Sequence, residues 1–211
     1  MKTEHADADE RLDNSAKLLT QMREKVPDSV AGHSKCLVVI PSLVKAGVVI
    51  GGQSGKGYAT CESAKGWSAP APITISGGTL GAQLGVESTE LLGVVTSDKG
   101  MNALMTGNFR VGVDASAAAG PVGTGKSTST GISEGGDLVS YSRSKGLFAG
   151  ANLDGTTIKT DEDATRALYG APHEMKVLLE GKVAVPNGAP MERFMSAVRG
   201  GYGKHHSVAM R

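Results

Sequence analysis

The chain has 211 residues, enough for one large domain or two small ones, and its 22 basic and 21 acidic side chains leave a formal charge of +1. This balance gives no overall attraction to nucleic acid, although local basic patches are compatible with it. No run of apolar residues approaches the roughly 18 that a membrane-spanning helix needs. The 30 glycines, about twice the usual share of roughly 7%, indicate tightly turned strands with close backbone contacts.

The first predicted element is a helix over residues 5–26. Leu12, Leu19, Met22 and Val26 recur at helical spacing, acidic side chains crowd the first turns, and a proline follows directly. A short helical turn is expected at 28–34. The apolar face of the long helix has no large aromatic side chain, so we expect it to pack on a sheet and not to lie in a membrane interface.

From Cys36 onward the pattern changes to that of strands. "CLVVI" is a continuous apolar strand, and residues 46–61 predict two more strands joined by a glycine-rich turn at Gly55–Gly57. Strand patterns continue over 73–96 and 109–120. Between them, residues 97–107 predict a short helix that Ser97 or Asp98 would cap.

The last part of the chain predicts strands followed by helices. Two or three strands are expected between 137 and 160, with a turn at Asp154 and Gly155. Residues 161–170 predict a helix with an acidic first turn and Gly170 as its end, and shorter helices are expected at 172–180 and 190–199.

Short connections between consecutive strands favour antiparallel pairing. The sequence therefore predicts a single α+β domain over 5–199. Its sheet should be curved, mostly antiparallel and barrel-like, with helices from the N- and C-terminal segments. Residues 200–211 have no periodicity and predict a mobile tail.

Cys36 and Cys61 are the two cysteines of the chain. They leave two interpretations open: two half-buried thiols, or one disulfide between neighbouring strand ends, which requires an oxidising compartment. The N-terminal "MKTEHADADERLD" has no apolar signal core. The protein is therefore either cytosolic or an exported protein whose signal is absent from this sequence.

Residues 120–127, "GPVGTGKS", fit the phosphate-binding loop of nucleotide hydrolases. In a working loop a helix begins at the Lys-Ser pair, because its N-terminus and backbone amides hold the phosphates. The segment that follows, "STSTGISEGGD", is a poor helix because it is rich in β-branched residues and glycine. The sequence therefore favours a chance match, and nucleotide hydrolysis is the least favoured function.

Other catalytic and metal-binding patterns are weaker still. "GISEG" at 131–135 lacks the buried strand that precedes a hydrolase nucleophile, and "SRSK" at 142–145 falls in a predicted strand or hairpin instead of a helix. His33 and Cys36 are close enough in sequence to bind one metal ion together, but the sequence has no second closely spaced pair of ligands to complete a zinc site. The acidic residues of "DEDAT" at 161–165 are better explained as the cap of a helix than as calcium ligands. The sequence predicts no catalytic residue, no metal site and no cofactor.

Basic residues cluster around the predicted turns, where they are either ordinary solvated charge or a patch for lipid headgroups or another polyanion. They are Lys45, Lys56, Lys65, Arg110, Arg143 and Lys145.

Several strings together resemble the SYLF-domain family, in order and spacing across roughly residues 10–180. They are "VIPSLVKAGVVIGGQSGKG" (39–57), "GWSAPAPITISGGTLGAQLGVESTELL" (66–92), "VGVDASAAAGPVG" (111–123), "SYSRSKGLFAGANLDG" (140–155) and "RALYG" (166–170). "GPVG" belongs to such a string and predicts a tight turn after a strand, whereas "TGKS" is a local addition.

The resemblance implies a non-enzymatic lipid-binding module. Eukaryotic relatives, often fused to SH3 domains, bind phosphoinositides; fungal relatives bind and bundle actin; bacterial relatives stand alone and are usually exported. This chain is similar to the bacterial type. We therefore expect it to bind anionic phospholipid or phosphoinositide-type headgroups, and no nucleic acid. The alternative is a scaffolding module for an envelope or cytoskeletal protein. The implied location is periplasmic or membrane-associated, with the cytoplasm as the alternative.

The resemblance also selects the first candidates for headgroup contact. The family carries basic residues at positions like Lys45, Arg143 and Lys145. Lys56 and Lys126 complete the candidate set, because each lies in a predicted glycine-rich turn. Leu168 stands where relatives often have phenylalanine, which reduces the aromatic surface available for insertion into a bilayer.

Overall fold

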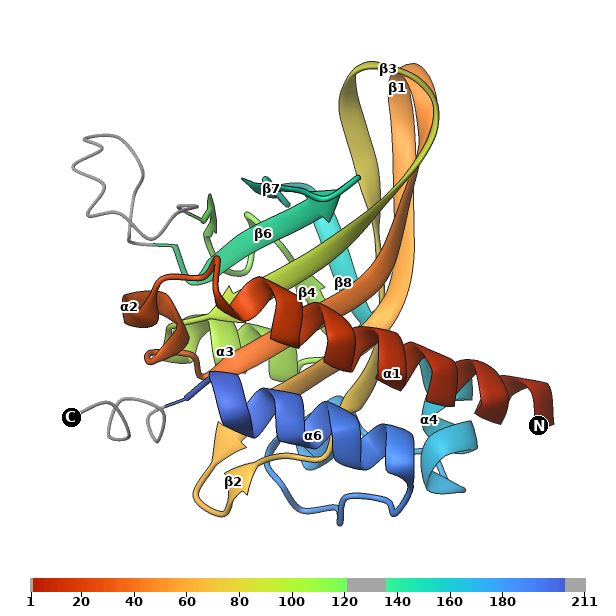
Figure 1. The fold of residues 1–211 in the computed structure, drawn as a ribbon, viewed down its shortest axis with the longest axis vertical. Coiled ribbons are helices and arrows are strands. Elements are labelled where there is room, and N and C mark those ends of the chain that lie inside the picture. Colours follow the sequence, from red (N-terminus) through yellow and green to blue (C-terminus); the bar gives the residue numbers. More distant parts are fainter. Residues whose placement is uncertain (1, 121–135, 204–211) are drawn as a thin grey trace.

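A computed structural model describes residues 2–120 and 136–203, with the backbone alone at residues 2, 48–50 and 79–86. Two long strands dominate it: β1 (Cys36–Ser63) and β3 (Ala71–Val95). They pair antiparallel from Cys36 opposite Val95 to Ala59 opposite Ala71, with register shifts near Ile40 and Gly47. Figure 1 shows the paired ribbon rising above the rest of the molecule, bending over and returning.

Because the ribbon bends, the two ends of β1 cross at its base. Cys36 and Cys61 form a disulfide there, with their Cα atoms 3.9 Å apart. A Cβ atom on Gly57 would lie 1.9 Å from the Val39 carbonyl oxygen, and one on Gly55 would lie 2.7 Å from the Ser42 carbonyl oxygen. The prediction of a turn at Gly55–Gly57 is therefore wrong. β1 continues through these residues as one strand, and the glycines allow its second half to cross close to its first half.

Shorter strands extend both arms of the ribbon. β6 (Leu138–Ser144) pairs with the second half of β3, and β5 (Ala117–Ala119) and β7 (Leu147–Gly150) both pair with β6. β8 (Thr156–Thr160) pairs with the first half of β3 and with β4 (Asn108–Arg110). β2 (Gly66–Trp67) pairs with the end of β1. Among the named strand pairs of the described residues, only β5 and β6 run parallel, so the expectation of a curved, mostly antiparallel α+β fold is confirmed.

Helices from both ends of the chain cover one face of the sheet. α1 (Lys2–Arg23) and α6 (Ala189–Gly201) lie side by side there (Figure 1). α2 (Asp28–Ala31), α3 (Asp98–Met105), α4 (Glu162–Tyr169) and α5 (Met175–Leu179) are shorter. Ser97 and Asp161 cap α3 and α4, and Gly170 ends α4 with a φ of 72°, as the sequence predicts. None of the described helices is both long and apolar enough to cross a membrane.

The apolar residues divide into two cores. One lies between the arms of the ribbon and holds Val38, Ile40 and Ile73. The other lies between the sheet and the helices α1 and α6, and includes Leu37 and Val39. Alternate residues of "CLVVI" therefore face different cores, which explains why this strand is apolar throughout.

The predicted apolar stripe of the first helix is confirmed. Leu12, Leu19, Met22 and Val26 are all buried against the sheet and α6. This helix accordingly has a packing role in the fold, because the face that carries its large apolar side chains is already covered.

Candidate functional site

Four cations gather around the hairpin formed by β6 and β7. We call this surface the basic edge; it consists of Lys25, Lys45, Arg143 and Lys145. Arg143 forms an ion pair with Glu90 of β3. Its neighbour Ser144 donates a hydrogen bond to Glu87 at 2.5 Å, and the Cα partner of Glu87 across the ribbon is Lys45.

Phe148 of β7 brings Lys25 into the same surface. The Lys25 ammonium and the Arg143 guanidinium each lie 5.8 Å from the centre of the Phe148 ring. Such cation–π contacts contribute about 0.5–1 kcal/mol at exposed positions. The ring therefore links the end of α1 to the β6–β7 hairpin.

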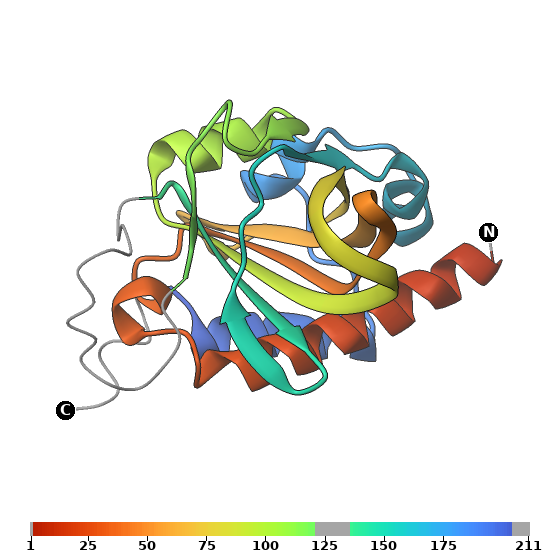
Figure 2. The ribbon, with the colours of Figure 1, turned by 90° about the horizontal axis from the view of Figure 1, so that it is seen from above.

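The hairpin turn places Lys145 at its tip. Lys145 has a φ of 49° and Gly146 a φ of 80°, as a two-residue turn of type I′ requires. Lys145 is exposed, and it is the one non-glycine residue with positive φ in the described part of the chain. Figure 2 shows this hairpin reaching past α1 at the bottom of the view.

An exposed apolar side chain follows the turn. Leu147 has 77% of its surface exposed, and Val44, next to Lys45, has 41%. The basic edge therefore combines cations with partly and largely exposed apolar side chains.

The four cations differ in how far they are committed within the fold. The hydrogen bonds and charge of Glu90 raise the pKa of Arg143, and both side chains of this pair are mostly buried. Lys25 and Lys145 are exposed and form no ion pair with any described residue. Arg143 thus positions the hairpin against β3, while Lys25 and Lys145 are available to bind an anion from outside the protein.

Of the five candidate cations, Lys56 lies outside this surface. Lys56 is on the other arm of the ribbon, where its ammonium lies 2.8 Å from the carboxylate of Asp161. Because Asp161 is 6% exposed and caps α4, Lys56 serves a structural ion pair. Lys126 falls outside the described residues. The structure thus brings together Lys45, Arg143 and Lys145 and separates Lys56 from them.

The structure places some of the residues of the weaker catalytic and metal-binding motifs. The described residues hold no cluster of three or more metal-ligating side chains. Residues 142–145 lie in β6 and its turn, not in the helix that a Ser-x-x-Lys site needs. Residues 121–135 of the two glycine-rich motifs lie outside the described part. Gly120, the first residue of the motif at 120–127, packs against Tyr141, because a Cβ atom on this glycine would lie 2.2 Å from the Tyr141 ring. Burial raises the pKa of Tyr141 to about 12.

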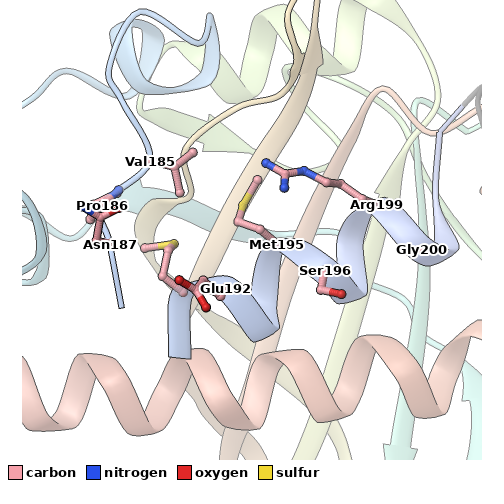
Figure 3. Close-up of a pocket in the computed structure, with 9 residues that line it drawn as sticks. Val185, Pro186, Asn187, Glu192, Met195, Ser196, Arg199 and Gly200 are labelled. Carbon is pink, nitrogen blue, oxygen red and sulfur yellow. The ribbon is translucent and has the colours of Figure 1, made fainter. Parts of the chain in front are cut away.

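Two hollows flank α6. The first, of about 800 Å³, runs between α1 and α6, and an ion pair between Arg193 and Asp13 at 2.7 Å lies on its wall. Hydrogen bonding to Arg193 lowers the pKa of Asp13. The second, of about 530 Å³, lies between α6 and the segment 185–187 (Figure 3). Its lining residues are Val185, Pro186, Asn187, Met191, Glu192, Met195, Ser196, Arg199 and Gly200.

Sequence reasoning missed two parts of the basic edge. Lys25 lies at the end of the predicted first helix, and no sequence pattern connects it with a hairpin more than a hundred residues away in the chain. Leu147 and Phe148 look like two equivalent apolar strand residues, although Leu147 is exposed and Phe148 is half-buried. Their alternation in the strand is the signal that they face opposite sides.

The chain is similar to proteins described as regulators of actin. Residues 76–200 match the Ysc84 family model, whose description reads "Las17-binding protein actin regulator". An SH3 domain-containing protein of Schizosaccharomyces pombe is 36% identical over 180 residues, which cover 83% of this chain and 42% of that protein. Protein YSC84 of Saccharomyces cerevisiae is 32% identical over 185 residues, covering 85% of this chain and 39% of that protein.

A vertebrate relative extends the comparison. The SH3 domain-containing YSC84-like protein 1 of Bos taurus is 28% identical over 163 residues, covering 76% of this chain and 48% of that protein. This chain spans less than half the length of these relatives. Two of these relatives are named for their SH3 domains, and a further relative from Saccharomyces cerevisiae is named LAS seventeen-binding protein 3. These names describe binding proteins or SH3-containing proteins and not enzymes. No solved structure matches the chain.

The family model spans residues 76–200, which is more than half of the chain, and the relative from Schizosaccharomyces pombe matches 83% of the chain at 36% identity. The chain belongs to the Ysc84 family of SYLF-domain proteins.

Proposed function

We propose that this protein is a non-enzymatic module that binds anionic phospholipid or phosphoinositide-type headgroups at a membrane surface through the basic edge. The observation that supports this most is the gathering of Lys25, Lys45 and Lys145 around one projecting hairpin. Each lysine near an anionic membrane surface contributes about 1 kcal/mol to binding. The neighbouring Val44 and Leu147 add exposed apolar surface.

Sedimentation with lipid vesicles tests this function. We expect the protein to pellet with vesicles that contain phosphatidylserine or a phosphoinositide and to stay in solution with vesicles of phosphatidylcholine alone. Raising the salt concentration should weaken the binding, because it screens exposed charges. Equal, negligible pelleting with both kinds of vesicle would contradict the proposal.

A second candidate function is protein scaffolding. It is supported by the description of the family, which names Las17 binding and actin regulation, and by the groove of about 800 Å³ between α1 and α6. Small side chains such as Ala16, Ala197 and Gly200 line this groove and leave room for a partner's side chains. Sedimentation with filamentous actin tests it, with Ala197→Arg as the variant that obstructs the groove. Binding that survives this substitution would argue against the groove.

We also propose that the protein works outside the reducing cytoplasm, in the periplasm or at a membrane. The support for this is the Cys36–Cys61 disulfide, since such bonds persist in oxidising compartments. Fractionation of the source cells, followed by detection of the protein in each fraction, tests the location.

A further inference from the structure

The tip of the β6–β7 hairpin has features that the fold itself does not require. Lys145 and Gly146 form the turn, and Leu147 follows with 77% of its surface exposed. The other exposed large apolar side chains of the described residues are Val113, 67% exposed in the loop between β4 and β5, and Val44, 41% exposed and next to Lys45.

Lys145 is an unusual choice for its backbone position. Two-residue turns of type I′ favour Asn-Gly or Gly-Gly, because both central residues need a positive φ. A lysine at a φ of 49° is therefore less favourable for the turn than asparagine would be. A residue kept in a strained conformation at an exposed tip points to a role for its side chain.

The charges around the tip favour a negatively charged partner. Lys25 and Arg143 each lie 5.8 Å from the centre of the Phe148 ring. Lys45 is the Cα partner of Glu87, which accepts a hydrogen bond from Ser144. Glu90 is bound by Arg143. The four cations of the basic edge therefore outnumber these two carboxylates, and an exposed leucine stands at the tip of the same hairpin. Cations together with exposed apolar side chains favour binding at the interface of an anionic bilayer.

We propose that the hairpin tip is a membrane wedge: Leu147 enters the boundary between headgroups and acyl chains, while Lys145 contacts a headgroup phosphate. This inference rests on the proposed function and adds to it the segment that enters the bilayer and the orientation of docking. The hairpin lies at the edge of the molecule beside α1 in Figure 2, and Lys145 and Leu147 at its tip are exposed.

An environment-sensitive fluorophore placed at the tip tests the wedge. Because both native cysteines are in the disulfide, the variant Leu147→Cys offers one reactive thiol for an NBD label. Val113→Cys is the matched control, since Val113 is 67% exposed but lies near the Arg110–Asp114 ion pair, away from the basic edge. With phosphatidylserine vesicles, the label at position 147 should brighten and shift to shorter wavelength, and the label at 113 should not.

A binding measurement with unlabelled variants accompanies it. Leu147→Ser should weaken partitioning into phosphatidylserine vesicles about tenfold, because the apolar side chain is lost from the interface. Val113→Ser should leave partitioning unchanged.

The outcomes separate the wedge from the proposed function. Pelleting with anionic vesicles together with a response confined to position 147 supports both. Pelleting with no response at position 147 overturns the wedge and leaves the lipid-binding function standing. No pelleting of the wild-type protein overturns both.

Discussion

At the scale of single residues, Lys145 shows a conflict between backbone preference and side-chain chemistry. Its φ of 49° suits asparagine or glycine better than lysine, yet the position faces outward beside Leu147. A left-handed conformation costs an ordinary residue about 1–2 kcal/mol. Stability and binding should therefore respond in opposite directions to the same substitution.

The variant Lys145→Asn should raise the free energy of unfolding by about 1 kcal/mol, since asparagine tolerates this conformation. The same variant should bind anionic vesicles more weakly. Urea denaturation and vesicle sedimentation measure the two effects. Lys65→Asn, in the turn between β1 and β2, is the control and should show neither. A fall in stability for Lys145→Asn would contradict this account of the turn.

Asp137 is a second residue whose surroundings allow a prediction. Its carboxylate accepts hydrogen bonds from the Ser97 hydroxyl at 2.5 Å and from the amide and hydroxyl of Ser116 at 2.9 and 2.8 Å. The hydrogen bond from Ser97 is the main cause that holds the pKa of Asp137 below its ordinary value of 3.8. The carboxylate thus ties the start of α3 to the segment before β5.

Asp137→Asn should lower the free energy of unfolding by about 2 kcal/mol at neutral pH. Because the folded pKa is depressed, this stabilisation is complete above the unfolded value of about 3.8 and is lost as the pH falls through the folded value. The difference in the free energy of unfolding between Asp137→Asn and the wild-type protein should therefore become smaller below about pH 4. Urea titrations at several pH values measure it. An equal free energy of unfolding for both proteins at pH 7 would contradict the role of Asp137.

At the scale of elements, the crossing of β1 with itself is the feature on which the ribbon depends. Gly57 has no space for a side chain there, because its Cβ would overlap the Val39 carbonyl. Gly52, on the same strand, is exposed. A Cβ atom added to it would lie 3.9 Å from the nearest atom, the Gly77 carbonyl oxygen, which is an ordinary contact distance. The two glycines therefore form a matched pair.

Gly57→Ala should destabilise the protein by about 3 kcal/mol, since the backbones must move apart at the crossing. Gly52→Ala should change the stability by less than about 0.5 kcal/mol, as surface substitutions commonly do. Thermal or urea unfolding compares the two variants. Similar stabilities for both would show that the strands do not cross closely.

Local patterns predicted the elements better than their connections. The apolar stripe of α1 and the caps of α3 and α4 can be recognised from neighbouring residues. The glycines at 55 and 57 carry the same local signal whether they form a turn or a close crossing. Only the contact with Val39, far away in the sequence, decides between the two.

The same limit applies to the candidate site. Lys45 lies two residues before Gly47 and Lys56 lies between two glycines, so both look like lysines near turns in the sequence, but the bend of the ribbon places them on different arms. Lys56 then meets Asp161, whereas Lys45 lies beside the β6–β7 hairpin. Lys25 joins that surface only because α1 packs along the sheet.

At the scale of the whole molecule, one covalent bond closes the base of the ribbon. The Cys36–Cys61 disulfide spans 25 residues, for which loop-closure entropy predicts a stabilisation of about 3.5 kcal/mol. Urea denaturation with and without reductant should show a loss of this size. Titration with a thiol reagent should find no reactive thiol in the denatured protein until a reductant is added. Two reactive thiols before reduction would contradict the bond.

The central claim is that the basic edge, and not charge in general, attaches the protein to anionic membranes. It is tested most directly by vesicle sedimentation of Lys45→Gln/Lys145→Gln against Lys65→Gln/Lys159→Gln, two exposed lysines elsewhere. Both pairs remove the same charge. The account predicts that the first pair weakens binding to phosphatidylserine vesicles about thirtyfold, while the second pair leaves it near the wild-type value. Equal losses for the two pairs, or none for the first, would contradict it.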